Sequence, residues 1–180
     1  MRHWLLTWTT YGSWLPGDDR GSITAIRVNT SGHRVHYNLP GTPAVGALVE
    51  LRKAAADLMT GPPIFLVNEQ ANVLLDQFHE TANVRSYGLD AVAIMANHIH
   101  IVVTVDGDPE PETLLRDFKS YGSRSLNRRW GKPVNGTWWT VSGSKRKLPV
   151  EDARQAAIEY VKNQEYALII WTAEDASNAR

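Results

Sequence analysis

The stretch ANHIHIVV (residues 96–103) carries two histidines, one residue apart, inside an apolar run. Isoleucine and valine favour β-strands, so the stretch is expected to be a strand. Side chains alternate across a strand, which places His98 and His100 on one face and the two isoleucines on the other. The isoleucine face should pack against helices. The two imidazoles should then project from the opposite, more open face of a sheet.

Strand and helix patterns alternate along the rest of the chain. The apolar runs 89–96 and 98–105 are separated only by Asn97, which predicts a tight hairpin. Further strands are expected at 2–10, 64–70 and 136–143, helices at 42–61, 71–88, 111–131 and 151–167, and a long loop at 12–40. This order predicts an α+β fold of the ferredoxin-like split βαβ type. An antiparallel sheet would have helices on one face, and its other face would be free for a site or for the C-terminal helix.

Length and composition limit the classes of protein that the chain can belong to. Its 180 residues suit one domain spanning 1–180. The absence of cysteine excludes disulfides, cysteine-ligated zinc and a thiol nucleophile, and it fits a reducing, cytoplasmic location. No apolar run approaches the roughly 20 residues of a membrane span, so we expect no membrane partner.

Positive charge is concentrated in one part of a chain whose formal net charge is zero. Between Leu115 and Val150 lie nine lysines and arginines, and Asp117 is the only acid. Such a cluster is typical of a surface that binds a phosphate backbone, even on a neutral protein. A solvated basic helix face is the alternative, and charge alone does not separate the two.

The histidine pair has two interpretations. Two neutral imidazoles on one strand face can bind one divalent ion. The alternative is a pair of partly buried structural histidines that are hydrogen-bonded to their neighbours. Two ligands are also too few for a metal site, so a third polar residue would have to come from elsewhere in the chain.

The last expected helix offers such a residue. Tyr160 and Gln164 are four residues apart and lie on one face of the helix. A helical projection places them in the same narrow sector as Ala153 and Ala157, which should face the body of the protein. A buried amide needs polar partners. Metal coordination through the amide oxygen would satisfy Gln164, and a hydrogen bond to a core tyrosine is the alternative.

These motifs together resemble a known family. The His-hydrophobic-His of NHIH resembles the signature of HUH endonucleases, and Tyr160 followed by Gln164 resembles their single-tyrosine transposase branch. TWTTYGSWLPGDDRGS (7–22) and WWTVSGSKRKL (138–148) are similar to segments of REP-associated tyrosine transposases. The resemblance covers most of the chain and is weakest over 22–60. Many REP-associated members carry Asn four residues after the tyrosine, whereas insertion-sequence transposases carry Gln, as this chain does.

The resemblance implies a metal-dependent transposase that cleaves single-stranded DNA beside a small hairpin. His98, His100 and Gln164 would hold Mg²⁺ or Mn²⁺, and Tyr160 would be the nucleophile. Cleavage would leave a 5′-phosphotyrosine link and a free 3′-OH, and strand transfer would reverse it. Asn163 is a less well placed substitute ligand, since it projects about 100° away from Gln164. The resemblance allows either a homodimer or a monomer.

The basic helix expected at 111–131 and the basic turn SKRKL (144–148) should carry the phosphate contacts. The candidates for phosphate contacts are Arg124, Arg128, Lys145, Arg146 and Lys147. Of the adjacent Trp138 and Trp139, one could stack on a base and the other should be in the core, because they alternate in direction on a strand. Trp4 and Trp8 are expected to pack in the core.

Tyr121 is the rival nucleophile. Its neighbour four residues on is Ser125, a poorer metal ligand than an amide, so Tyr160 is favoured. A neutral ligand set of two imidazoles and one amide suits Mn²⁺ better than Mg²⁺, and we expect activity with both. Two other classes compete with this hypothesis. One is a non-catalytic single-stranded or hairpin DNA-binding protein that retains the fold, and the other is an unrelated ferredoxin-like metal-binding enzyme.

Overall fold

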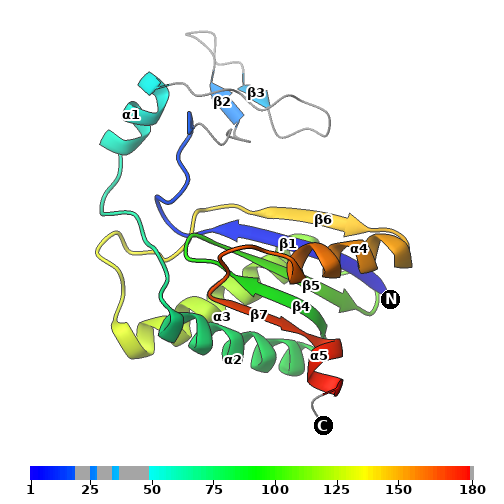
Figure 1. Cartoon of the computed structure of the whole chain (residues 1–180). Coiled ribbons are helices and arrows are strands. Elements are labelled where there is room, and N and C mark those ends of the chain that lie inside the picture. Colours follow the sequence, from blue (N-terminus) through cyan, green and yellow to red (C-terminus); the bar gives the residue numbers. More distant parts are fainter. Residues whose placement is uncertain (19–24, 28–33, 37–48, 179–180) are drawn as a thin grey trace.

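A five-stranded antiparallel sheet forms the centre of the computed structural model, which describes residues 1–18, 25–27, 34–36 and 49–178. The strands are β1 (Arg2–Thr9), β4 (Gly88–Ile94), β5 (His98–Val105), β6 (Ser144–Leu148) and β7 (Ile169–Thr172). Their order across the sheet is β6-β1-β5-β4-β7, and every neighbouring pair is antiparallel. The chain therefore begins on one of the inner strands of the sheet (Figure 1).

The connections give this sheet the predicted ferredoxin-like topology. Helix α2 (Asn68–Arg85) lies between β1 and β4 in the chain, a tight hairpin joins β4 to β5, and α3 (Pro111–Trp130) lies between β5 and β6. Without β7, the order β6-β1-β5-β4 is that of a split βαβ fold. The expected fold class and the expected hairpin at Asn97 are confirmed.

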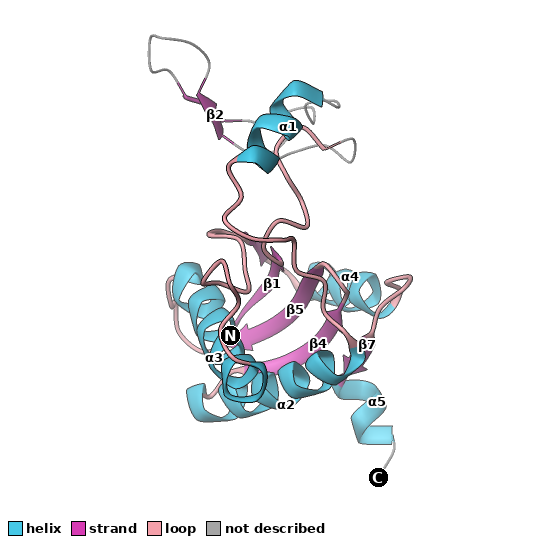
Figure 2. Ribbon diagram, turned by 90° about the vertical axis from the view of Figure 1, so that its left-hand side faces the viewer, coloured by secondary structure: helices cyan, strands magenta, loops and turns pink. Residues whose placement is uncertain are grey.

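Helices α2 and α3 cover one face of the sheet (Figure 2). Large aromatic and aliphatic side chains form the core cluster on this side. Trp8, Phe78 and Phe118 are buried and contact one another edge to face, with ring centroids 5.9 Å apart for Trp8 and Phe78 and 5.7 Å apart for Phe78 and Phe118. Ile99 and Ile101 of β5 point into the same cluster. This is the packing that the isoleucine face of the 96–103 stretch predicts.

Helix α4 (Glu151–Lys162) covers the other face of the sheet (Figures 1 and 2). The apolar cluster beneath it is smaller and consists of Leu5, Ala91, Ala93, Val102, Leu148, Ala157, Ile158 and Val161. Three of its members are alanines, so the helix lies on a shallow surface. The face opposite α2 and α3, which was expected to be free for a site or a further element, is thus covered by α4.

Several expected elements differ from the observed ones. Residues 64–67 are extended but belong to no strand, and residues 68–70 form the first turn of α2. The fourth core strand is not 136–143 but the basic segment β6 that follows it. β6 lies at the edge of the sheet, where a charged strand is tolerated. Its consecutive charged residues lack the alternation of apolar and polar residues by which a strand is recognised in a sequence. Neither β7 nor α5 (Ala173–Asn178) was anticipated.

The expected boundaries of two helices also change. The helix expected at 42–61 is observed as α1 (Val49–Asp57), and residues 42–48 lie outside the described part of the chain. The helix expected at 151–167 ends at Lys162. Most of the loop expected at 12–40 is likewise outside the described residues, which include two short paired strands there, β2 (Ala25–Arg27) and β3 (Arg34–His36). Within the described segments, no helix is long and apolar enough to cross a membrane.

Lys119 of α3 explains why 136–143 does not form a strand. Its ammonium group donates hydrogen bonds to the carbonyl oxygens of Thr140, Val141 and Ser142, at 2.6, 3.2 and 3.0 Å. Those three carbonyls consequently bind a side chain rather than a neighbouring strand. Burial, together with the charge of Lys145, lowers the pKa of Lys119 to about 8, so the group still carries its proton at neutral pH.

We predict that Lys119→Met lowers the free energy of unfolding by about 2–4 kcal/mol, because three carbonyl groups lose one shared donor. Urea denaturation measures the change. Lys132→Met is the matched control, since Lys132 is exposed and its replacement should change the free energy by no more than about 0.5 kcal/mol. Equal effects of the two substitutions would show that Lys119 does not hold the 140–142 turn.

Candidate active site

His98 and His100 lie side by side on the face of β5 that α4 covers. Their ring centroids are 4.8 Å apart and their planes are nearly perpendicular, at 83°. His100 is opposite Thr7 in the pairing of β5 with β1, and opposite Ala93 in the pairing with β4. Ala93 belongs to the cluster under α4, which identifies the face. The alternation of the strand thus places both imidazoles away from the aromatic core.

Each imidazole is oriented by a hydrogen bond at Nδ1. The Nδ1 atom of His100 lies 2.7 Å from the hydroxyl of Thr7, and that of His98 lies 2.7 Å from Oδ1 of Asn97. An amide oxygen only accepts hydrogen bonds, so Nδ1 of His98 is the donor. Metal-binding histidines commonly use the same arrangement, in which one ring nitrogen is held by a neighbour and the other is the ligand atom.

His100 is kept neutral by its surroundings. Only 5% of the residue is exposed. This burial, and secondarily the neighbouring His98, lowers the pKa of His100 to about 4. At neutral pH its imidazole is therefore uncharged, which is the form that binds a metal ion.

Tyr160 of α4 brings a phenol to this pair. Its hydroxyl oxygen lies 3.5 Å from Nε2 of His100, and the two ring centroids are 5.2 Å apart. The buried residues of α4 are Ala157, Ile158 and Val161. Tyr160 is at the edge of this buried sector and is 50% exposed, so it is more open to solvent than its helical projection suggested.

The two amides after α4 are held on the last turn of the helix. Gln164 follows the helix end, and its Nε2 donates to the carbonyl of Tyr160 at 3.0 Å. Asn163 donates in the same way to the carbonyl of Glu159 at 2.9 Å. The amide of Gln164 is thus attached to the backbone of the residue that carries the phenol.

The donor set fits a divalent ion. His98 and His100 are adjacent, His100 is neutral, and each ring has its Nδ1 engaged elsewhere. The described side chains contain no group of three or more His, Cys, Asp or Glu residues that could hold a metal. A third protein ligand on the described residues would therefore be an amide or hydroxyl, and Gln164 is the amide that the sequence singles out.

The basic residues selected from the sequence are distributed over both faces of the sheet. In β6, Arg146 pairs with Leu5 and shares the α4 face, whereas Lys145 pairs with Leu6 and shares the opposite one. Lys145 forms an ion pair of 2.7 Å with Glu112 of α3. The remaining candidates are Lys147, which lies 5.8 Å from the ring centre of Trp4, and the exposed Arg124 and Arg128 of α3.

The structure shows where the tryptophans and the rival tyrosine considered in the sequence lie. Trp138 and Trp139 are both buried, and their indole N–H groups donate to Asn127 Oδ1 and to the Lys119 carbonyl. The expectation that one of them could stack on a base is therefore wrong. Trp4 and Trp8 are in the core, as expected. Tyr121 belongs to α3, on the opposite side of the sheet from the histidines, where it contacts Arg85 and Arg124.

Two residues of the site were missed in the sequence. Thr7 orients His100, and only the register between β1 and β5 shows that they meet. Asn97 orients His98, and its own carbonyl accepts from the backbone N–H of Thr10 at 2.9 Å. The hydroxyls of Thr10 and Ser13 lie 3.2 and 3.0 Å from the same carbonyl oxygen. The segment after β1 thereby holds the turn from which His98 emerges.

Comparison with known proteins identifies a family that matches this chain. The IS200-like transposase family matches residues 64–164, more than half of the chain. No curated protein matches the chain. Two solved structures are similar to this chain at low identity. One is a REP-associated tyrosine transposase bound to a REP hairpin, with 11% identity, a TM-score of 0.46, and 88% of this chain and 63% of that chain covered.

This chain thus spans less than two thirds of that transposase. The other structure is a transposase candidate from Deinococcus radiodurans R1, with 16% identity, a TM-score of 0.46, and coverage of 91% of this chain and 92% of that one. The family assignment depends on neither likeness, because the matched segment itself contains His98, His100, Tyr160 and Gln164. The chain belongs to the family of IS200-like transposases.

Proposed function

We propose that the protein is a metal-dependent endonuclease and strand transferase for single-stranded DNA, with Tyr160 as its nucleophile. One observation carries the proposal: the hydroxyl of Tyr160 lies 3.5 Å from Nε2 of a buried, neutral His100, whose neighbour is His98. This constellation lies within the segment matched by the transposase family. It is assembled within one chain, so the proposal requires no second copy, although a homodimer is compatible with it.

The chemistry assigned to Tyr160 is the exchange of one phosphodiester for another. Its phenol oxygen would form a bond to the phosphorus while the bond from phosphorus to the 3′ oxygen breaks. The products are a 5′-phosphotyrosine link and a free 3′-OH, and strand transfer is the reverse reaction with another 3′-OH. Tyr160 is half exposed, so a DNA strand can reach the phenol and its proton can pass to solvent.

The metal ion would be held by Nε2 of His98, Nε2 of His100 and Oε1 of Gln164. When bound, Mg²⁺ or Mn²⁺ supplies positive charge that polarises the phosphate. Imidazole ligands favour Mn²⁺ over Mg²⁺, so the activity should be stronger with Mn²⁺. Thr7 and Asn97 would keep both rings in the orientation that presents Nε2.

The DNA substrate would be a single strand beside a hairpin. Arg146 is the candidate for phosphate contacts near the site, because it shares the α4 face with the histidines. Lys145, Lys147, Arg124 and Arg128 would contact phosphates farther away.

We predict that a hairpin-bearing single-stranded oligonucleotide and Mn²⁺ give a covalent protein–DNA adduct, which a denaturing gel separates from free protein. Tyr160→Phe should abolish the adduct, because the nucleophilic oxygen is removed, and EDTA should do the same. Tyr121→Phe is the matched control and should leave the adduct unchanged, since Tyr121 lies across the sheet.

Other outcomes would change the proposal in different ways. An adduct that depends on Tyr121 would overturn the choice of nucleophile but keep the reaction class. Tight binding of single strands with no adduct, across a pool that holds many hairpins, would favour the non-catalytic DNA-binding alternative.

We further predict that Gln164→Ala weakens Mn²⁺ binding by about 10-fold or more, because one ligand is lost. Electron paramagnetic resonance of free Mn²⁺ measures the affinity, in a Tyr160→Phe background that prevents cleavage. Asn163→Ala is the matched control, because it removes the neighbouring amide, and it should change the affinity by less than about twofold. If the two substitutions have equal effects, Gln164 is not the third ligand.

A further inference from the structure

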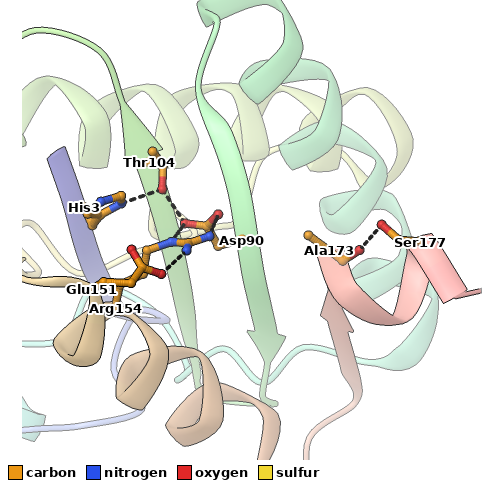
Figure 3. A network of polar contacts seen from close by, with 7 residues as sticks. All are labelled: His3, Asp90, Thr104, Glu151, Arg154, Ala173 and Ser177. Carbon is orange, nitrogen blue, oxygen red and sulfur yellow. Dashed lines mark hydrogen bonds and ion pairs between the residues drawn. The ribbon is translucent and has the colours of Figure 1, made fainter. Parts of the chain in front are cut away.

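We propose that Asp90 and Arg154 form a clamp that positions α4, and with it Tyr160, over the histidine pair. The proposal rests on the function proposed for Tyr160 and adds a positioning role to two residues that would touch neither metal nor DNA. In the structure, Asp90 belongs to β4 and Arg154 to the first half of α4 (Figure 3). Tyr160 follows Arg154 by six residues, about 9 Å along the helix axis.

The clamp is a two-pronged ion pair. Nε of Arg154 donates to one carboxylate oxygen of Asp90 at 3.1 Å, and Nη2 donates to the other at 2.8 Å. Such parallel bonds fix the relative orientation of two groups as well as their distance. Asp90 is 8% exposed, so its charge has little access to water and depends on this partner. The remaining nitrogen of Arg154 donates to the exposed Glu151 at 2.6 Å.

The sheet is shaped to present this carboxylate. The pairing of β4 with β5 shifts register between Leu89 and Ala91, which leaves Asp90 as the extra residue of a bulge. The hydroxyl of Thr104 donates to Asp90 at 2.6 Å. That hydroxyl has only one hydrogen, so in its contact with His3, at 2.7 Å, it is Nδ1 of His3 that donates. Thr104 of β5 therefore holds Asp90 in place, and His3 of β1 in turn holds Thr104 (Figure 3).

The apolar contacts of α4 do not fix its position to the same degree. Its buried residues are Ala157, Ile158 and Val161, and they pack in one cluster with Leu5, Ala91, Ala93, Val102 and Leu148 of the sheet. This cluster contains no aromatic side chain and is much smaller than the one under α2 and α3, so it resists a shift of the helix less. At the far end of α4, Lys162 and Asp175 are 4.0 Å apart and largely exposed, which is a weak contact.

Tyr160 cannot hold the helix by itself. Its phenol is half exposed, and its contact with His100 is 3.5 Å long, at the outer limit of a hydrogen bond. A displacement of the phenol by about 1 Å is enough to lower a reaction rate by about 100-fold. The Asp90–Arg154 pair is thus the most directional contact between α4 and the sheet, and the phenol depends on it.

The test compares four variants under single-turnover conditions, at saturating hairpin oligonucleotide and Mn²⁺. Arg154→Met should lower the rate of adduct formation by about 100-fold, while the dissociation constant for the oligonucleotide changes by less than about twofold. Arg154→Lys keeps the positive charge but cannot form the two parallel hydrogen bonds, so it should recover part of the rate of adduct formation. Asp90→Asn should give a rate of adduct formation similar to that of Arg154→Lys. Glu151→Gln is the matched control and should stay within about twofold of the unchanged protein, because it removes only the exposed partner.

A second measurement does not require cleavage. The protein is labelled with 3-fluorotyrosine, and the ¹⁹F resonance of residue 160 is assigned as the line that Tyr160→Phe removes. His100→Ala should move this line, because the phenol loses its neighbour. Arg154→Met should move it toward the position seen in His100→Ala, whereas Glu151→Gln should leave it in place.

The two measurements separate failure of the clamp from failure of the proposed function. If the unchanged protein forms no adduct but the ¹⁹F line responds to Arg154→Met, the clamp stands and the proposed function falls. If Arg154→Met changes neither the rate nor the line, the clamp is refuted. If Arg154→Met does not fold, as judged by circular dichroism, the milder Asp90→Asn decides by the same two criteria. An equal loss of rate in Glu151→Gln also refutes the clamp.

Discussion

The pairing of β1 with β5 is the constraint on which the rest of the structure depends. Eight residue pairs, from Arg2 opposite Val105 to Thr9 opposite His98, set one register. In that register Thr7 meets His100, and both imidazoles lie under α4. A slip of one residue would turn the imidazoles into the aromatic core and the buried isoleucines out of it. The packing of one face therefore determines the chemistry available on the other.

The two faces of the sheet have different physical roles. Trp8, Phe78 and Phe118 interlock on the side of α2 and α3, where large side chains make sliding costly. The cluster under α4 is smaller, has no aromatic member and includes three alanines, so less of the helix position is determined by shape. Polar contacts take over this role at Asp90 and Arg154. A helix held in this way can carry a half-exposed tyrosine without burying it.

The sequence predicts the fold where periodicity is strong and fails where charge conceals it. Alternation in 98–105 correctly assigns the two faces, and the long amphipathic pattern of 111–131 correctly gives α3. β6 was missed because SKRKL is an edge strand whose charged side chains resemble a turn, and 136–143 was misassigned because the carbonyls of this segment bind Lys119. In the site, spacing correctly places Tyr160 on α4, but Gln164, which was expected on the same helix face, lies beyond the helix end at Lys162. No local pattern could show that Thr7 and Asn97 orient the histidines, because those contacts come from strand register and from a turn.

The same alternation in β6 constrains how DNA could lie on the protein. Arg146 shares the α4 face with Tyr160, whereas Lys145 and Lys147 point to the face of α2 and α3. β6 is an edge strand, so these side chains lie around one margin of the sheet. Under the proposed function, this margin is one route by which a strand bound at Tyr160 reaches the arginines of α3. Phosphates on the two faces would then be contacted by different parts of the substrate, with the cleaved strand on one face and the more distant segment on the other.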